Sequence, residues 1–315
     1  ECSGHGSQIL TCTYAHGEKA GSLKAMKKNH EITPAVERLI TEALAIEADS
    51  AQNAGALGFI ARAMVQATLP HKKVEGNEFE RRNGNYTLTL LAPSKIGLPY
   101  GTVPRLLLAW LTTEAVKTQS RELELGDSLS GFMRELDMVP TGGRWGSITR
   151  LKDQTKRLFS CTVSATYEDG QKSAFLNQSI ASKAVLWWDT KDPEQAGLWQ
   201  STVTLSEAFF SEVVSHPVPV DMRALKALKK SPLALVAYCW LTYRASYAKR
   251  PSVMPWSVLA LQFGSDYAEL RFFKRAFLEE LRKVVTVYGG VQVEATDEGL
   301  LVKPSLTHIS KQGGT

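Results

Sequence analysis

The sequence contains no apolar run of the roughly 18 residues that a membrane-spanning helix needs, and its N-terminus shows no basic segment leading into a hydrophobic stretch. We therefore expect a cytoplasmic protein without a membrane partner. Only 4 of the 315 residues are cysteines, and two of them, Cys161 and Cys239, stand alone in apolar contexts where they are expected to be small buried side chains. A phosphate-binding loop of the form G-x-x-x-x-G-K-[ST] is also missing, which argues against an ATP site of that type.

Metal-binding and catalytic patterns are equally scarce. The 6 histidines are scattered singly, so the sequence lacks the H-x-H pair that a metal-dependent DNA-nicking initiator uses. Cys2, His5, Cys12 and His16 lie close together, but their spacing matches no zinc module. We expect no metal, no cofactor and no enzymatic activity. The Gly- and Ser-rich residues 1–25 are expected to be a disordered upstream extension.

The net charge is mildly positive, at +5 from 37 basic and 32 acidic residues, but the positive charge is clustered. Residues 144–159 carry five basic side chains against one acidic, a local charge of +4. Residues 221–250 carry seven against one, a local charge of +6. Clustered cations on helices are typical of a surface that binds a polyanion, and a solvated helix face is the simpler alternative.

The same order of expected elements occurs twice, about 130 residues apart. Each copy begins with an apolar helix that is opened by a proline and contains Trp-Leu-Thr, followed by a short helix and a basic amphipathic helix. Two strands around an Asp-Gly or Glu-Gly turn complete each copy. The helices are expected at 103–116, 126–137 and 147–159 in the first copy and at 231–246, 254–265 and 267–284 in the second.

This order is that of a winged helix-turn-helix domain. The chain is therefore predicted to be an α+β protein with two such domains in tandem, at 98–200 and 201–315. Residues 1–97 are predicted to form an N-terminal extension and arm. The arm would contain a helix capped by Thr33, a second helix over about 57–68, and a hairpin around an Asn-Gly turn.

Each basic helix combines an apolar side with a side of hydrogen-bond donors. The apolar positions expected in the core are Ile148, Leu151, Leu158 and Phe159 in the first helix and Leu270, Phe273, Phe277, Leu281 and Val284 in the second. The side chains expected to contact DNA are Ser147, Arg150, Lys152, Gln154, Lys156 and Arg157 in the first helix and Arg271, Lys274, Arg275 and Arg282 in the second. Arginine can bond guanine O6 and N7, glutamine can pair with adenine, and Ser147 and Lys156 can hold phosphates.

One segment also resembles a known family. The run Gly97-Leu98-Pro99-Tyr100-Gly101 is followed by Pro104-Arg105, by Trp110-Leu111, by Thr113-Glu114-Ala115 and then by the stretch LKDQTKRLF. This pattern resembles the plasmid-encoded RepA replication initiators, and the resemblance extends over roughly residues 80–305. The block from LPYG to TEA is its most specific part.

The resemblance implies a protein that binds direct repeats (iterons) at a plasmid origin, opens an adjacent A·T-rich region and recruits host initiator, helicase and sliding-clamp components. It also implies a monomer–dimer equilibrium, and main base readout by the C-terminal winged helix. By position, that assigns Arg271, Lys274 and Arg275 to bases and the 147–157 helix to a second groove or the backbone. Two alternatives remain: a winged-helix repressor of its own promoter and, more distantly, a DNA-nicking replication enzyme.

Overall fold

The computed structural model describes residues 33–62, 65, 68–186, 201–264 and 267–309. In this part the chain is a mixed α/β protein with nine helices and several small antiparallel sheets. The helices are α2 (Pro34–Ala48), α4 (Val103–Thr118), α5 (Leu129–Glu135), α6 (Ser147–Ser160), α7 (Glu207–Ser215), α8 (Met222–Leu228), α9 (Pro232–Ala245), α10 (Trp256–Phe263) and α11 (Leu270–Val287). None of these described helices is long and apolar enough to cross a membrane.

The strands pair only in antiparallel fashion within the described residues. They are β1 (Leu57–Ala61), β2 (Glu78–Asn83), β3 (Tyr86–Leu91), β4 (Glu122–Glu124), β5 (Thr162–Glu168), β6 (Ser173–Ser179), β7 (Ala181–Val185), β8 (Thr202–Leu205), β9 (Pro217–Asp221), β10 (Ser252–Pro255), β11 (Val293–Ala295) and β12 (Gly299–Val302). The four sheets have the orders β2-β3-β5-β6, β4-β8-β7, β1-β9 and β10-β12-β11.

The repeated order of elements is confirmed. In the first copy α4, α5 and α6 precede the β5–β6 hairpin, and in the second α9, α10 and α11 precede β11 and β12. The hairpin turns lie where the sequence places them, and Gly170 takes the left-handed conformation (φ +86°) that favours glycine. Trp110 of α4 is a core residue, 6 % exposed, with its ring centroid 5.0 Å from that of Phe132.

The predicted helix over 57–68 is wrong at its start, because residues 57–61 form strand β1. This strand pairs with β9, from Leu57 opposite Asp221 to Ala61 opposite Pro217. The apolar run fits a helix or a strand equally well, and a partner some 160 residues away decides between them. Glycine at position 58 of β1 leaves room for the Met222 side chain, because a Cβ there would lie 2.4 Å from the Met222 sulfur.

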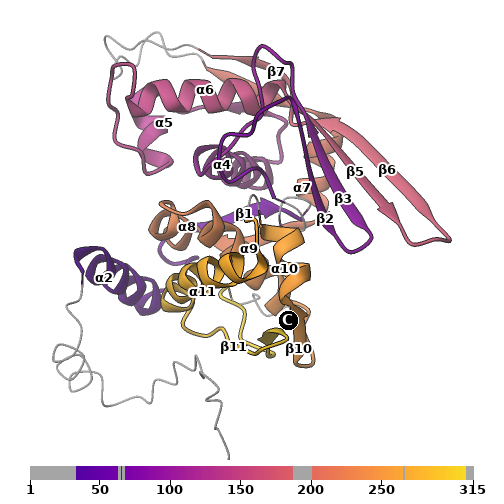
Figure 1. Cartoon of the computed structure of the whole chain (residues 1–315). Helices are drawn as coiled ribbons and strands as arrows, with labels where there is room; N and C mark the ends of the chain where they lie inside the picture. The colour runs from indigo at the N-terminus through magenta and orange to yellow at the C-terminus, as the bar shows by residue number, and fades with distance from the viewer. Residues whose placement is uncertain (1–32, 63–64, 66–67, 187–200, 265–266, 310–315) are drawn as a thin grey trace, which may run out of the picture.

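The N-terminal elements pack onto the two copies. The β2–β3 hairpin turns at Gly84 (φ +59°), as the Asn-Gly signal predicts, and β3 then pairs with β5 of the first copy. Helix α2 packs instead against α8 and α11. In Figure 1 the first copy lies above and the second below, with the β1–β9 ladder between them.

Side chains also link the segment with α8 to the first copy and to the N-terminal arm. The Lys229 ammonium, at the end of α8, donates to both the carboxylate and the main-chain carbonyl of Asp137, in the loop between α5 and α6. Asp137 itself has a positive φ of 55°, a conformation that asparagine and aspartate tolerate better than most residues. Elsewhere the buried Asp221 carboxylate pairs with Arg223 at 2.7 Å, and Arg223 reaches the Asp49 carbonyl oxygen after α2 at 2.9 Å.

Candidate nucleic-acid interface

Helix α6 presents one apolar side to the core and one basic side to solvent. Ile148, Leu151 and Leu158 are at most 2 % exposed, and the helix packs against α4. The apolar stripe expected from the sequence is therefore confirmed at these three positions, and its fourth member, Phe159, is partly buried against the core. On the outer side the exposed cations are Arg150 and the two lysines Lys152 and Lys156. None of the three has a carboxylate partner within the described residues.

Two of the expected DNA-contacting residues lie on the inner side of α6. Ser147 is 4 % exposed, and its hydroxyl donates to the Val139 carbonyl oxygen at 2.5 Å while accepting from the Thr141 N–H at 2.9 Å. Gln154 is 5 % exposed and accepts from the Tyr100 N–H at 2.8 Å. The expectation that these two side chains face solvent is therefore wrong. Each of them is hydrogen-bonded to backbone groups on the inner side of the helix.

Arg157 occupies the edge of the basic side. Its guanidinium pairs with Asp153 one turn earlier at 2.8 Å, and its Nη1 donates to the Leu98 carbonyl oxygen at 3.4 Å. The guanidinium carbon also lies 5.6 Å from the Tyr100 ring centroid. The Arg157 side chain is only 16 % exposed, and its contacts hold the Gly97–Gly101 segment against α6.

Helix α11 has the same division. Phe273, Phe277, Leu281 and Val284 are at most 1 % exposed, whereas Leu270 is 46 % exposed and does not join the expected apolar stripe. Leu270 is the first residue of α11, so it lies at the edge of the packed surface.

Three arginines lie along the outer side of α11. Arg271, Arg275 and Arg282 are exposed, and their spacing of four and seven residues places them on one side of the helix. The Arg271 guanidinium contacts Glu269 with Nε 2.8 Å from Oε2 and Nη2 2.9 Å from Oε1. Arg275 and Arg282 have no ion-pair partner among the described residues.

Lys274 is directed away from this row. Its ammonium lies 5.0 Å from the Trp256 ring centroid and donates to the Thr296 carbonyl oxygen at 3.3 Å, in the turn between β11 and β12. The side chain is partly buried and stabilises its own domain. An ammonium held against a tryptophan face is a favourable cation–π arrangement.

The two basic helices do not form one continuous surface. Figure 1 shows α6 at the top and α11 near the bottom, with α4, α8 and α9 between them. The second charged segment of the sequence, residues 221–250, does not present all of its cations to solvent as free charges. Several of its cations have internal partners: Arg223 with Asp221, Lys229 with Asp137, and Arg244 with the Ser252 hydroxyl at 2.7 Å.

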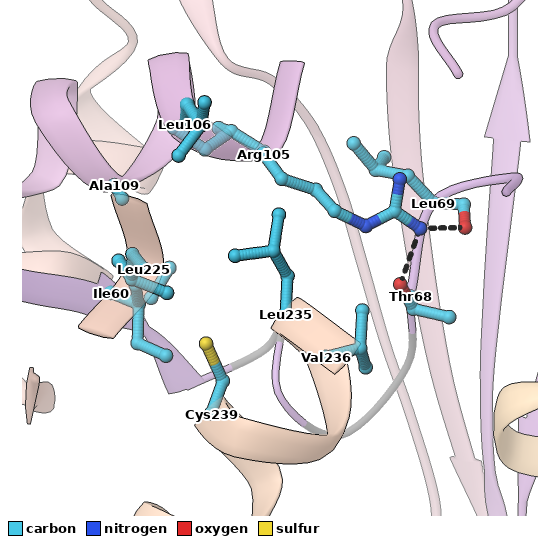
Figure 2. Close-up of a pocket in the computed structure, with 12 residues that line it drawn as sticks. Ile60, Thr68, Leu69, Arg105, Leu106, Ala109, Leu225, Leu235, Val236 and Cys239 are labelled. Carbon is cyan, nitrogen blue, oxygen red and sulfur yellow. Dashed lines mark hydrogen bonds between the residues drawn. The ribbon is translucent and has the colours of Figure 1, made fainter. Parts of the chain in front are cut away.

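Arg105 is a partly buried cation that sequence patterning leaves unexplained. Its guanidinium donates to the carbonyl oxygens of Pro70, Leu69 and Gly101 and to the Thr68 hydroxyl. Burial lowers its pKa to about 9. It lies beside a cavity of about 50 Å³ lined mainly by apolar side chains of α4, β1 and α9. Figure 2 shows the residues around this cavity. The four bonds assign this arginine to holding residues 68–70 and 101 against α4.

Sequence patterning also missed Trp145, which lies immediately before α6. Its side chain is 83 % exposed, and the Arg144 guanidinium carbon lies 5.2 Å from its ring centroid. Helical periodicity cannot find a residue that precedes the helix. The available signal was an aromatic residue within the polar stretch Gly-Gly-Arg-Trp-Gly.

No group of three or more potential metal ligands occurs within the described residues, and the segment with Cys2, His5, Cys12 and His16 lies outside them. Cys161 is a buried free thiol and Cys239 a partly buried one, and burial raises the pKa of each to about 12. Glu114 of α4 pairs with Lys117, three residues further along the helix, at 3.9 Å.

The fold resembles that of a solved structure. Crystals of selenomethionine derivatives of domains 2 and 3 of RctB give a TM-score of 0.51 at 12 % identity, covering 77 % of this chain and 96 % of that one. A second crystal structure of RctB domains 2–3 gives 0.47 at 12 % identity, covering 76 % and 96 %. A search among curated proteins finds no match. The model of the family described as "Plasmid encoded RepA protein" matches residues 98–256, which is half of the chain, so this protein belongs to the plasmid-encoded RepA family.

Proposed function

We propose that this protein is a plasmid replication initiator that binds duplex DNA through α6 and α11. One observation carries the proposal: each of two repeated units holds, as its third helix, an amphipathic helix with a buried apolar side and an outward basic side. A major groove admits such a helix, and the exposed arginines and lysines suit phosphates and base edges.

The proposed architecture is two winged helix-turn-helix domains, at 98–200 and 201–315. The second copy supports it, since β10, the strand before α10, pairs with β12, and β12 pairs with β11, giving a three-stranded sheet that contacts α10. The first copy differs, because β4 pairs with β8 and the β5–β6 hairpin continues into the β2–β3 hairpin. The β2–β3 hairpin of the N-terminal arm thus enlarges the first wing.

Within this proposal the helices have different roles. The arginines of α11, at 271, 275 and 282, read bases, and Arg150, Lys152 and Lys156 of α6 hold phosphates. Because the two helices lie apart in Figure 1, they would meet different segments of the duplex. Several protomers on direct repeats would then share the cost of deforming the DNA, about 1–6 kcal/mol for a smooth bend of one site.

The remaining features of an initiator are part of the same proposal. Protein-induced bending on direct repeats would promote opening of a neighbouring A·T-rich duplex without catalysis by this chain. The partners would be the host initiator, the helicase and the sliding clamp, and a monomer–dimer equilibrium would set which form binds. The protein would act in the cytoplasm, with its plasmid.

In-vitro selection of random duplex DNA by the purified protein tests this function, at a physiological salt of about 0.15 M. A long motif whose footprint recurs head to tail at the origin is the expected result. A single inverted repeat would favour the repressor, and nicked circles formed with Mg²⁺ or Mn²⁺ would favour the enzyme. Salt-sensitive binding without any selected motif would contradict a specific initiator.

A further inference from the structure

The loop between α5 and α6 carries the most exposed described tryptophan. Trp110, Trp240 and Trp256 are 6 %, 4 % and 3 % exposed, whereas Trp145 is 83 % exposed and Val139, at the other end of the loop, is 77 % exposed. A tryptophan stabilises a fold by burying its large apolar surface. A tryptophan ring that lies in solvent is therefore more typical of a residue that contacts a ligand than of one that packs in the core.

This loop is closed by its own hydrogen bonds. The Ser147 N–H donates to the Thr141 hydroxyl at 2.9 Å, and the Ser147 hydroxyl joins both Thr141 and Val139. The Gly146 N–H donates to the Gly143 carbonyl oxygen at 3.1 Å, and a Cβ on Gly146 would lie only 2.2 Å from the Thr141 carbonyl oxygen. Trp145 is therefore presented on a fixed support immediately before α6.

The surroundings of Trp145 are positively charged. Arg144 lies over its ring, and α6 adds the exposed Arg150, Lys152 and Lys156, all without carboxylate partners within the described residues. The matching ligand must combine negative charge with a flat aromatic face. A nucleic-acid strand supplies both, as phosphates and bases, and proteins that bind single strands use this combination of aromatic and basic side chains.

We propose that Trp145 stacks on an unpaired base of single-stranded DNA while Arg144 and the cations of α6 hold the flanking phosphates. In an intact duplex each base face is covered by the next base, so stacking there would first require unstacking, whereas a single strand offers an open face. The inference rests on the proposed initiator function, because an opened origin supplies such a strand.

The test measures single-stranded and duplex affinity separately, with the full chain. Fluorescence anisotropy follows a labelled thymine oligonucleotide of about 16 nucleotides, an upper site size for such binding, and the selected duplex. Trp145→Ala should weaken single-strand binding by about tenfold. Trp145→Phe should retain most of the affinity, and Val139→Ala, a matched exposed aliphatic change in the same loop, should have little effect.

A base analogue whose fluorescence reports stacking, placed in the single strand, should be quenched by the wild type and by Trp145→Phe but not by Trp145→Ala. Unchanged single-strand affinity in Trp145→Ala, or an equal loss with duplex, overturns the inference. Failure of the initiator proposal looks different: the wild type then selects no duplex motif, while the effect of Trp145→Ala on the single strand can persist. Thermal unfolding of each variant checks that the fold is retained.

Discussion

The Tyr100 N–H donates a hydrogen bond to Oε1 of Gln154 at 2.8 Å, joining the segment Gly97–Gly101 to the middle of α6. Arg157 supports the same junction from one turn further along, through its bond to the Leu98 carbonyl oxygen. The LPYG segment, which begins the most specific block of the family resemblance, is thus fixed to the basic helix by hydrogen bonds to its backbone. A residue beside a DNA-binding helix can thus be required for DNA binding without touching the DNA.

Replacing Gln154 with alanine should therefore lower the free energy of unfolding by about 1–3 kcal/mol, because a buried N–H is left without an acceptor. The selected DNA sequence should not change. Urea unfolding and repeated selection measure the two effects. The control Lys152→Ala alters an exposed side chain and should shift stability by less than about 0.5 kcal/mol. A changed base preference in Gln154→Ala would return this residue to the DNA-contacting set.

Arg105→Lys should also destabilise the protein, by about 1–3 kcal/mol, although it keeps the charge. A lysine ammonium cannot reproduce the planar fork that serves the carbonyl oxygens of Pro70, Leu69 and Gly101 together with the Thr68 hydroxyl. Chemical denaturation provides the measurement, and the exposed Lys117→Arg is the matched control. If Arg105→Lys were as stable as the wild type, water would be able to replace the hydrogen bonds that the guanidinium makes.

On α11 two neighbouring cations should behave differently. Arg275→Ala should lose about 1–3 kcal/mol of discrimination at one base pair, whereas Lys274→Ala should keep the selected motif and mainly lower stability, because its ammonium contacts Trp256 and the Thr296 carbonyl oxygen. Competition binding with single-base variants of the selected site measures the first effect. A uniform loss of affinity in Arg275→Ala would assign it to phosphate.

How far the sequence predicts this structure depends on the range of the interactions. The repeated helices and the buried sides of α6 and α11 follow from periodicity along the chain. Strand β1 and the inner positions of Ser147 and Gln154 do not, because their partners are β9, the Val139–Thr141 segment and Tyr100. Helical periodicity alone predicts that a serine or a glutamine faces solvent. It cannot reveal a backbone group, distant in sequence, that forms a hydrogen bond with the buried side chain.

Lys156→Ala should weaken binding to every duplex about equally. A residue that neutralises one phosphate releases roughly one counterion, so the slope of log K against log salt should fall by about 1. Titrations over a range of salt concentrations measure the slope. The control Lys117→Ala removes an exposed lysine that interacts with Glu114 on α4 and should leave the slope unchanged. A sequence-dependent loss would instead place Lys156 against a base edge.

His71 gives the protein a defined response to acid. Its Nε2 is buried without a hydrogen-bond partner within the described residues, and burial together with the charges of Arg105, Arg81 and Lys72 lowers its pKa to about 2 from 6.5. Below pH 6.5 the unfolded chain therefore binds a proton that the folded chain excludes. The contribution of His71 to the free energy of unfolding is therefore expected to be complete above that pH and to fall as the pH decreases, by up to about 1.4 kcal/mol per pH unit.

His71→Gln should remove this dependence, since glutamine binds no proton in either state. From pH 7 to pH 5 the free energy of unfolding should therefore drop more for the wild type than for His71→Gln. The difference between the two drops should be up to about 2 kcal/mol. Urea unfolding at both pH values measures it. His216→Gln is the matched control, because His216 is exposed and already beside Glu212 at 3.4 Å. Parallel pH profiles for the wild type and His71→Gln would show that His71 can take up its proton in the folded state.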